Sequence, residues 1–323
     1  MSSPVLCAYE LNGSGKSIPL EGAAVAKTLQ AKELGWVHLD ANHPDTKSWL
    51  EENVSYLDDI ILDALLVKET RPRISEYGNG ALIILRGVNL NPDADEEDMI
   101  SIRLWVDKNR IISTRLRKLK TIEDMRNKIQ SNNAPIDSGD FLMTLCTLLF
   151  KNMEPIITEL DERTDNIEED ILERPESVQR SEIIDIRKTA IMLRRYIAPQ
   201  REVLSALRTT DLGWMDEKDK RHAQENFDRL SRYIEELDTV RERAQIIKEE
   251  LSAIISDKMN KNMYMLSLVA AIFLPLGFLT GLLGINVGGM PGADNGAAFW
   301  LVVLLCIGSA VGIIALMKRL KWM

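Results

Sequence analysis

The sequence predicts an α+β domain followed by long α-helices and two C-terminal transmembrane helices. Strand-like runs separated by turn residues occur up to about residue 135. Amphipathic patterns of helical period follow from about residue 140. Two uncharged apolar stretches then occupy residues 263–283 and 297–317. We therefore expect three segments, which are residues 1–135, 136–260 and 261–323.

The first segment has the pattern of one compact domain around a mostly antiparallel sheet. Turn signals at residues 77–80 and 107–109 separate its strand candidates. Helices are expected at residues 45–53, 57–68 and 121–130. Strands are expected at residues 36–39, 81–88, 101–106 and 110–114.

The second segment has the pattern of long helices. We expect helices at residues 140–173 and 177–209, with kinks where Pro155 and Pro199 remove a backbone donor. Residues 214–274 contain neither Gly nor Pro. A single helix could therefore run for on the order of 90 Å, at 1.5 Å per residue, and continue into the first apolar stretch.

The two apolar stretches are long enough to cross a membrane, since about 20 residues of α-helix span a hydrocarbon core of roughly 30 Å. Lys258 and Lys261 precede the first stretch, and Lys318, Arg319 and Lys321 follow the second. The loop at residues 284–296 has no Lys or Arg. Because basic residues stay on the cytoplasmic side, we expect both termini and the first two segments in the cytoplasm.

Composition argues against several classes of function. The net charge of −9 disfavours a nucleic-acid partner, because phosphate binding needs a basic surface. The three cysteines have no CxxC spacing, so they predict neither a disulfide framework nor a structural zinc cluster. The soluble region has no nucleophile with a partnered base and no complete set of metal ligands, so an enzyme is not expected.

Two motifs in the first segment favour structural interpretations. Residues 13–17, Gly-Ser-Gly-Lys-Ser, resemble the end of a P-loop, but Glu10 replaces the first glycine and Ile18-Pro19 follows instead of a helix. His38 and His43, with the aspartates between and after them, could ligate a metal. No third and fourth ligands are evident near them, so we favour a structural role.

The loop between the apolar stretches begins with Gly284, Ile285 and Asn286. Two helices cannot enclose a polar path through lipid, so a pore built from this chain requires an oligomer. In a ring of subunits, Asn286 would supply a circle of neutral amide oxygens able to hold a hydrated cation. The alternative is a plain Gly and Asn turn between two helices.

These residues carry a resemblance to a known family. Gly284-Ile285-Asn286 after the penultimate span, Met290-Pro291 behind it and the basic ending resemble the CorA superfamily of divalent-cation transporters, whose hallmark is Gly-Met-Asn. Gly292 stands where magnesium-transporting members usually carry an acidic residue, and this departure resembles the zinc-transporting ZntB branch. Four further stretches resemble the family, namely residues 69–74, 111–115, 194–201 and 273–275.

The resemblance implies a fold and a set of site residues. It implies a homopentamer with a funnel-shaped cytosolic domain, with the first span lining the pore and Gly284, Ile285 and Asn286 forming the selectivity filter. Glu225 and Asp228 are the nearest candidates for a regulatory metal site in the cytosolic part. The resemblance places seven residues on the pore-lining stripe of the first span: Asn260, Met263, Ser267, Ala270, Leu274, Gly277 and Gly281.

We therefore expect an inner-membrane zinc transporter that passes hydrated Zn²⁺ in the direction of uptake. Whether this transport is coupled to protons is an open question. Its partners would be copies of itself, membrane lipid and divalent cations, with no prosthetic group. One alternative is a magnesium, cobalt or nickel channel of the same superfamily. An alternative from another class is a membrane-anchored scaffold or sensor.

Overall fold

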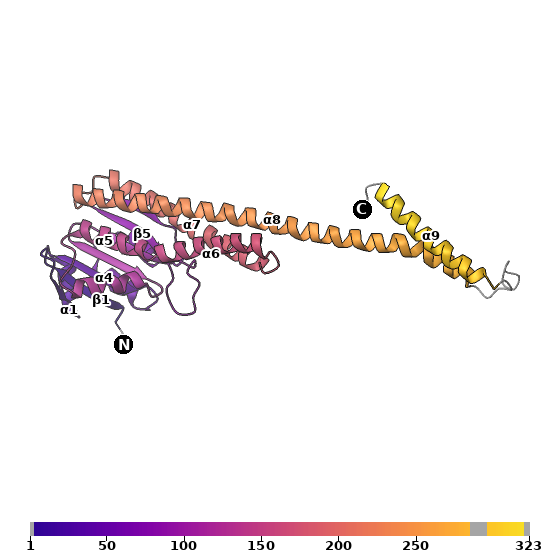
Figure 1. Ribbon diagram of the computed structural model, residues 1–323. Helices are drawn as coiled ribbons and strands as arrows, with labels where there is room; N and C mark the ends of the chain where they lie inside the picture. The colour runs from indigo at the N-terminus through magenta and orange to yellow at the C-terminus, as the bar shows by residue number, and fades with distance from the viewer. Residues whose placement is uncertain (1–2, 285–295, 320–323) are drawn as a thin grey trace. The chain divides into compact units, whose positions relative to one another are not determined.

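A computed structural model describes residues 3–284 and 296–319 of the chain (Figure 1). The chain divides into two compact units, Met1–Lys248 and Glu249–Met323, and the division falls inside one helix. The three-segment organisation expected from the sequence remains a prediction.

Strands and short helices alternate in the first part of the chain. The strands are β1 (Val5–Leu11), β2 (Ser17–Pro19), β3 (Leu34–Asp40), β4 (Arg73–Tyr77), β5 (Gly80–Gly87), β6 (Ile100–Val106) and β7 (Arg110–Arg115). The helices of this part are α1 (Ala23–Gln30), α2 (Thr46–Asn53), α3 (Asp59–Leu66) and α4 (Lys120–Gln130). The remaining helices are α5 (Ser138–Lys151), α6 (Glu154–Glu173), α7 (Arg180–Thr209), α8 (Glu217–Leu283) and α9 (Ala298–Arg319).

The seven strands form one sheet in the order β2-β1-β3-β7-β6-β5-β4. Only β3 and β7 pair in parallel, and all other neighbours are antiparallel. The α+β class and the mostly antiparallel sheet are therefore confirmed. The predicted strands correspond to β3, β5, β6 and β7, whereas β1, β2 and β4 were not predicted. β2 and β4 are the sheet edges, where partial exposure weakens the apolar pattern.

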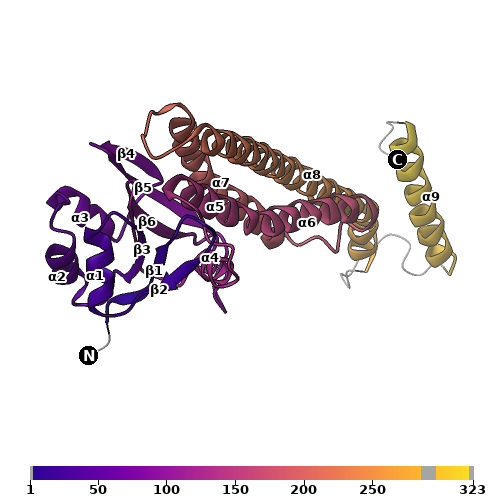
Figure 2. The ribbon, with the colours of Figure 1, turned by 90° about the vertical axis from the view of Figure 1, so that its left-hand side faces the viewer.

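Helices cover both faces of the sheet (Figure 2). On one face, α1, α2 and α3 bury an apolar core together with alternate strand residues such as Val37, Leu39 and Ile112. On the other face, the ring of Trp36 lies 5.0 Å from that of Phe141 on α5, measured between centroids. The period-2 alternation of β3 thus supplies side chains to two separate layers.

His38 belongs to this second layer and has a structural role. Its Nδ1 lies 2.8 Å from the Ser113 hydroxyl, to which the Trp36 indole also donates at 2.9 Å. Burial, the largest cause, lowers the pKa of His38 to about 3, so the ring is neutral. His43 lies in the turn after β3, with its Nδ1 3.9 Å from a carboxylate oxygen of Asp45. Among the described residues, His38 and His43 thus face different partners, Ser113 and Asp45.

The helical region begins with two helices where the sequence predicted one. α5 ends at Lys151 and α6 begins at Glu154, with Pro155 in its first turn. A proline fits the first turn of a helix because the missing N–H has no intrahelical partner there. Pro155 therefore begins a new helix instead of kinking a continuous one. α7, by contrast, continues through Pro199.

Helix α8 runs for 67 residues and belongs to both units. In the first unit it buries an apolar stripe that includes Leu230, Leu237 and Val240. Arg243 fastens it to α6, donating to Asp161 at 3.0 Å and to Glu168 at 2.6 and 2.9 Å. The predicted long helix is thus confirmed, and α8 and α9 are both long and apolar enough to span a membrane.

The beginning of α8 packs closely against the beginning of α5. Asp219 is 3% exposed and accepts a hydrogen bond from the Asp216 backbone N–H at 3.0 Å. Asp216 in turn accepts from the backbone N–H of Asp219 at 2.8 Å, so the two residues cap the helix reciprocally. A Cβ on Gly139 would stand 1.9 Å from Oδ2 of Asp219. The absence of a side chain at residue 139 therefore allows the contact.

Replacing Gly139 by Ala should destabilise the first unit by about 1–3 kcal/mol, because the added methyl group must displace a buried capping side chain. The measurement is thermal unfolding of the full chain in detergent, followed by circular dichroism. Gly213→Ala is the matched control, since nothing lies within 4 Å of its Cβ position. Equal unfolding temperatures for the two variants would contradict the packing argument.

Asp219 should also make stability depend on pH. Burial, with the charges of Asp137, Asp216 and Asp140, raises its pKa from 3.8 to about 6. Between pH 4 and pH 6 the folded chain then binds more protons than the unfolded chain, so this contribution to stability is lost as pH rises. Relative to Asp219→Asn, the natural chain should gain unfolding free energy when pH falls from 7 to 5. Relative to the control Asp211→Asn, at an exposed residue, the natural chain should gain no unfolding free energy over the same pH range.

Candidate functional site

The predicted pore-lining positions all lie on α8, in the unit Glu249–Met323. From Asn260 to Gly281 they recur at steps of three and four residues, so they form one stripe along the helix. Six of the seven are exposed in the single chain, and Ala270 is half-buried. Met263 and Leu274 are 60% and 72% exposed. The seven residues therefore share one surface of one helix.

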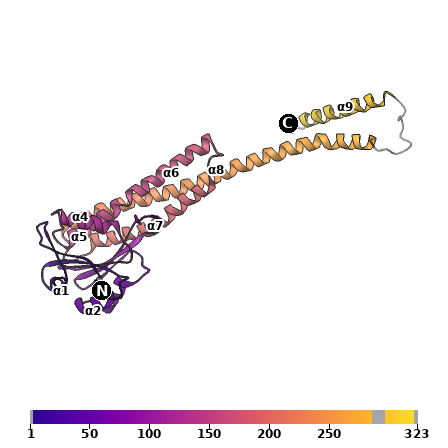
Figure 3. The same cartoon turned by 90° about the horizontal axis from the view of Figure 1, so that it is seen from below.

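Helix α9 covers a different surface of α8. It lies alongside the C-terminal part of α8 (Figures 1 and 3). Successive residues of an α-helix are rotated by about 100° around its axis. On α8 the half-buried residues therefore lie, on average, roughly half a turn around the axis from the predicted stripe. The stripe is thus left uncovered by the second candidate span. The half-buried residues include Leu268, Ile272, Leu276 and Leu279 on α8, and Val302, Cys306, Ser309 and Ile313 on α9.

The end of α8 has small residues and a closed hydrogen-bond pattern. No atom lies within 4 Å of the position that a Cβ would take at Gly277 or Gly281. The Thr280 hydroxyl donates to the Leu276 carbonyl at 3.0 Å, so it is engaged within the helix. The Gly284 N–H donates to the Thr280 carbonyl at 2.9 Å. Helical bonding therefore continues up to the predicted filter.

The other two predicted filter residues, Ile285 and Asn286, lie outside the described residues. Their role in ion selection remains a prediction from the sequence. Gly284 is the only member of the predicted filter that the structure places.

The spans themselves carry no charge. No Asp, Glu, Lys or Arg occurs at residues 262–283 or 298–317. Within the stripe, only the Asn260 amide and the Ser267 hydroxyl supply side-chain oxygen atoms. Such a surface cannot replace the whole water shell of a dication, because that requires several converging oxygen ligands. The stripe is therefore suited to a cation that keeps most of its water.

Glu225 and Asp228 lie one turn apart on α8, in the first unit. Asp228 accepts a hydrogen bond from the Gln224 side chain at 2.8 Å. Glu225 lines a cavity of about 300 Å³ together with His222 and Asp140. Within the described ranges 3–284 and 296–319, no three His, Cys, Asp or Glu side chains form a group that could hold a metal. The predicted regulatory site would thus need ligands from a second subunit.

Sequence reasoning did not separate the stripe from the surface that packs on α9. Both surfaces of α8 are apolar, and their spacing alone does not distinguish them. It also missed a cavity of about 580 Å³ beside β1, which is lined by residues from five elements and has no motif.

Known proteins resemble this chain over almost its whole length. The family model described as CorA-like Mg²⁺ transporter protein matches residues 31–319. Zinc transport protein ZntB of Yersinia enterocolitica is 36% identical over 321 residues, which are 99% of this chain and 97% of that protein. Divalent cation transporter CmaX of Pseudomonas aeruginosa is 38% identical over 320 residues, covering 98% of this chain and 96% of that protein.

A solved structure agrees with the fold. The structure of the full-length CmaX protein superposes with a TM-score of 0.86 at 36% identity, and covers 100% of this chain and 99% of that one. Its agreement extends over the sheet, the long helices and both candidate spans. The chain therefore belongs to the CorA-like Mg²⁺ transporter family.

Proposed function

We propose that this chain is a zinc transporter that passes hydrated Zn²⁺ through an oligomeric pore. The observation that carries the proposal is the full-length similarity to proteins named zinc transport protein ZntB, at 36% identity. The uncharged stripe on α8 supports it, because a neutral surface lets a hydrated dication pass without trapping it. The role is that of a transporter and not of an enzyme.

The pore requires several copies of the chain. One copy offers two candidate spans, and a polar path through lipid must be surrounded by helices. The uncovered stripe on α8 supplies the surface that would face the axis of such a ring, while α9 lies on the opposite side. The number of subunits, five, follows from the family resemblance.

Within this pore, Gly284, Ile285 and Asn286 would form the outer entrance, and the stripe from Gly281 to Asn260 the passage. Leu274 and Met263 are apolar and exposed, so rings of these side chains would form narrow hydrophobic constrictions. The basic residues before the first span and after the second support cytoplasmic termini and a filter on the outer side of the inner membrane.

Uptake is the direction that this arrangement favours. An inside-negative potential drives a dication inward by about 2.3 kcal/mol per charge per 100 mV. The spans contain no carboxylate that could relay protons. Proton coupling would therefore depend on groups outside the spans, and the flux assay below measures it directly.

Two alternative functions make different predictions. CmaX is named a divalent cation transporter without a stated metal, which favours a broader cargo that includes Mg²⁺, Co²⁺ or Ni²⁺. A membrane-anchored scaffold or sensor would need no ring of subunits. Chemical crosslinking in mild detergent separates this last case, since a persistent monomer would rule out the pore.

The selectivity filter can be tested by zinc flux into liposomes. Asn286→Ala should lower the initial rate about tenfold or more, because a hydrogen bond to a charged group contributes roughly 1.5–3 kcal/mol. Asn295→Ala, in the same loop, is the matched control. The assay compares Zn²⁺ with Mg²⁺, with and without a proton gradient. Magnesium flux without zinc flux would overturn the zinc assignment, and unchanged flux in Asn286→Ala would show that the filter lies elsewhere.

The orientation of α8 can be tested by cysteine accessibility. Ser267→Cys should react with a charged, membrane-impermeant methanethiosulfonate reagent added to open membrane fragments, because water fills the pore. Leu276→Cys should react far more slowly, because α9 covers it. Both variants are made with Cys306→Ala, which removes the native thiol of the spans. Faster reaction at residue 276 than at residue 267 would mean that the stripe does not face the pore.

A further inference from the structure

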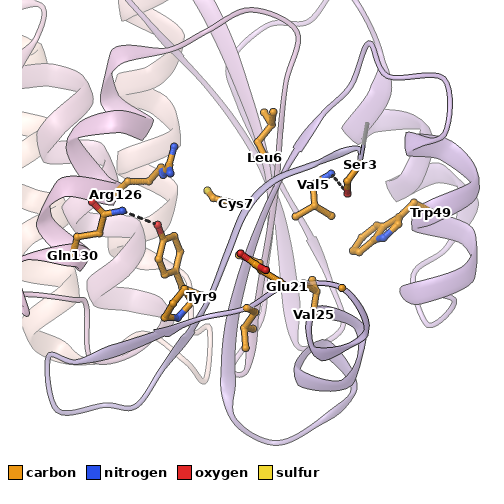
Figure 4. A pocket seen from close by; sticks show the side chains of 14 residues that line it. Ser3, Val5, Leu6, Cys7, Tyr9, Glu21, Val25, Trp49, Arg126 and Gln130 are labelled. Carbon is orange, nitrogen blue, oxygen red and sulfur yellow. Dashed lines mark hydrogen bonds between the residues drawn. The ribbon is translucent and has the colours of Figure 1, made fainter. Parts of the chain in front are cut away.

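One cavity of the first unit lies beside β1, outside the predicted ion path. It has a volume of about 580 Å³, within the range of small-molecule sites. Figure 4 shows side chains from β1, the turn before α1, helix α2 and helix α4 around it. The lining residues on which the inference depends are Cys7, Tyr9, Glu21, Val25, Trp49 and Arg126.

One wall of the cavity carries a positive charge that forms no ion pair with the described residues. Arg126 extends from α4 beside the Tyr9 hydroxyl, which also accepts a hydrogen bond from Gln130 at 3.3 Å. The hydrogen bond to Tyr9 raises the pKa of Arg126, so the guanidinium is charged at any working pH. Its Nε is buried and makes no hydrogen bond with the described residues. The nearby Glu123 instead pairs with Lys118 at 2.7 Å.

An exposed residue of the lining carries a negative charge that is also unpaired. Glu21 precedes α1, and its carboxylate points into the cavity (Figure 4). Among the described residues, no side-chain hydrogen bond or ion pair engages it, and no ion pair within 4.0 Å joins it to Arg126. Two opposite charges thus line one cavity without meeting. A ligand that bridges them would satisfy both.

The cavity also has apolar lining residues beside the charged ones. Val25 and the Trp49 ring contribute carbon surface, and Cys7 lies between Arg126 and Glu21 in Figure 4. Burial, opposed by Arg126 and Arg115, raises the pKa of the Cys7 thiol to about 11. The sulfur is therefore a neutral thiol at pH 7, which argues against a thiolate that binds metal. Leu6 has no partner residue in the β1–β3 ladder, because the register shifts between Val5 and Cys7.

We propose that this cavity binds a small zwitterion of the amino-acid class, with its carboxylate on Arg126, its ammonium group on Glu21 and its apolar body against Val25 and Trp49. One positive and one negative group with carbon surface beside them match the chemistry of that class. The site is independent of the ion path. It gives the sheet-containing unit a ligand of its own.

The test is isothermal titration calorimetry on the full chain in detergent, with glycine, L-alanine, L-leucine and γ-aminobutyrate as probes. At least one probe should bind about tenfold or more tightly than isovalerate or isobutylamine, each of which has only one of the two charges. Arg126→Gln and Glu21→Gln should each weaken that binding about tenfold or more. The matched controls Lys27→Gln and Glu33→Gln, exposed residues outside the lining, should bind like the natural chain.

A second readout follows the cavity itself. Bound zwitterion should slow modification of Cys7 by N-ethylmaleimide severalfold, measured by mass spectrometry of the peptide that contains it. Unfolding temperatures without ligand establish that the variants fold. The proposal is overturned if no probe binds at 10 mM, because binding weaker than about 10 mM is too weak to indicate specific recognition. Equal binding of isovalerate or isobutylamine, or binding unchanged in both charge variants, would also overturn it.

Discussion

The arrangement of this chain depends on one constraint, which is that backbone polar groups inside lipid must be paired within the protein. A membrane segment is therefore a continuous helix, and two such helices cannot enclose water. The chain satisfies the first condition with α8 and α9, whose described parts keep their bonding within each helix. It would satisfy the second by association with further copies. The uncovered stripe on α8 is the surface that association would enclose.

The same helix connects this membrane constraint to the packing of the first unit. Near its start, Asp216 and Asp219 cap α8 against α5, and Arg243 pairs it with three acids of α6. These contacts are made by side chains, so each can be removed by a single substitution without interrupting the backbone of the helix. A perturbation at the start of α8 therefore acts on the element that also carries the predicted pore-lining residues.

Much of this architecture could be predicted from residues 36–39, 81–88, 101–106 and 110–114, which are buried on both faces and hence strongly apolar. The edge strands β2 and β4 escaped prediction because neither has a fully buried residue, so their apolar pattern is weak. Pro155 was placed correctly but interpreted as a kink, since sequence does not show whether a proline begins a helix or interrupts one. The stripe and the α9-facing surface could not be separated, because in lipid both are apolar. Pairings such as Gly139 with Asp219 depend on tertiary contacts far apart in sequence.

The chemistry of the path also bears on which metal it can select. Zinc is distinguished from magnesium in proteins mainly by nitrogen and sulfur ligands. Neither the stripe nor residues 284–286 contain His or Cys, so apart from the Met263 thioether only neutral oxygen atoms are offered. Such oxygens act on the water shell, and the shells of divalent ions of similar size differ little. Transport of zinc by this chain would therefore depend more on which hydrated dication is available than on ligands that bind only zinc. A relative named as a divalent cation transporter, without a stated metal, agrees with that expectation.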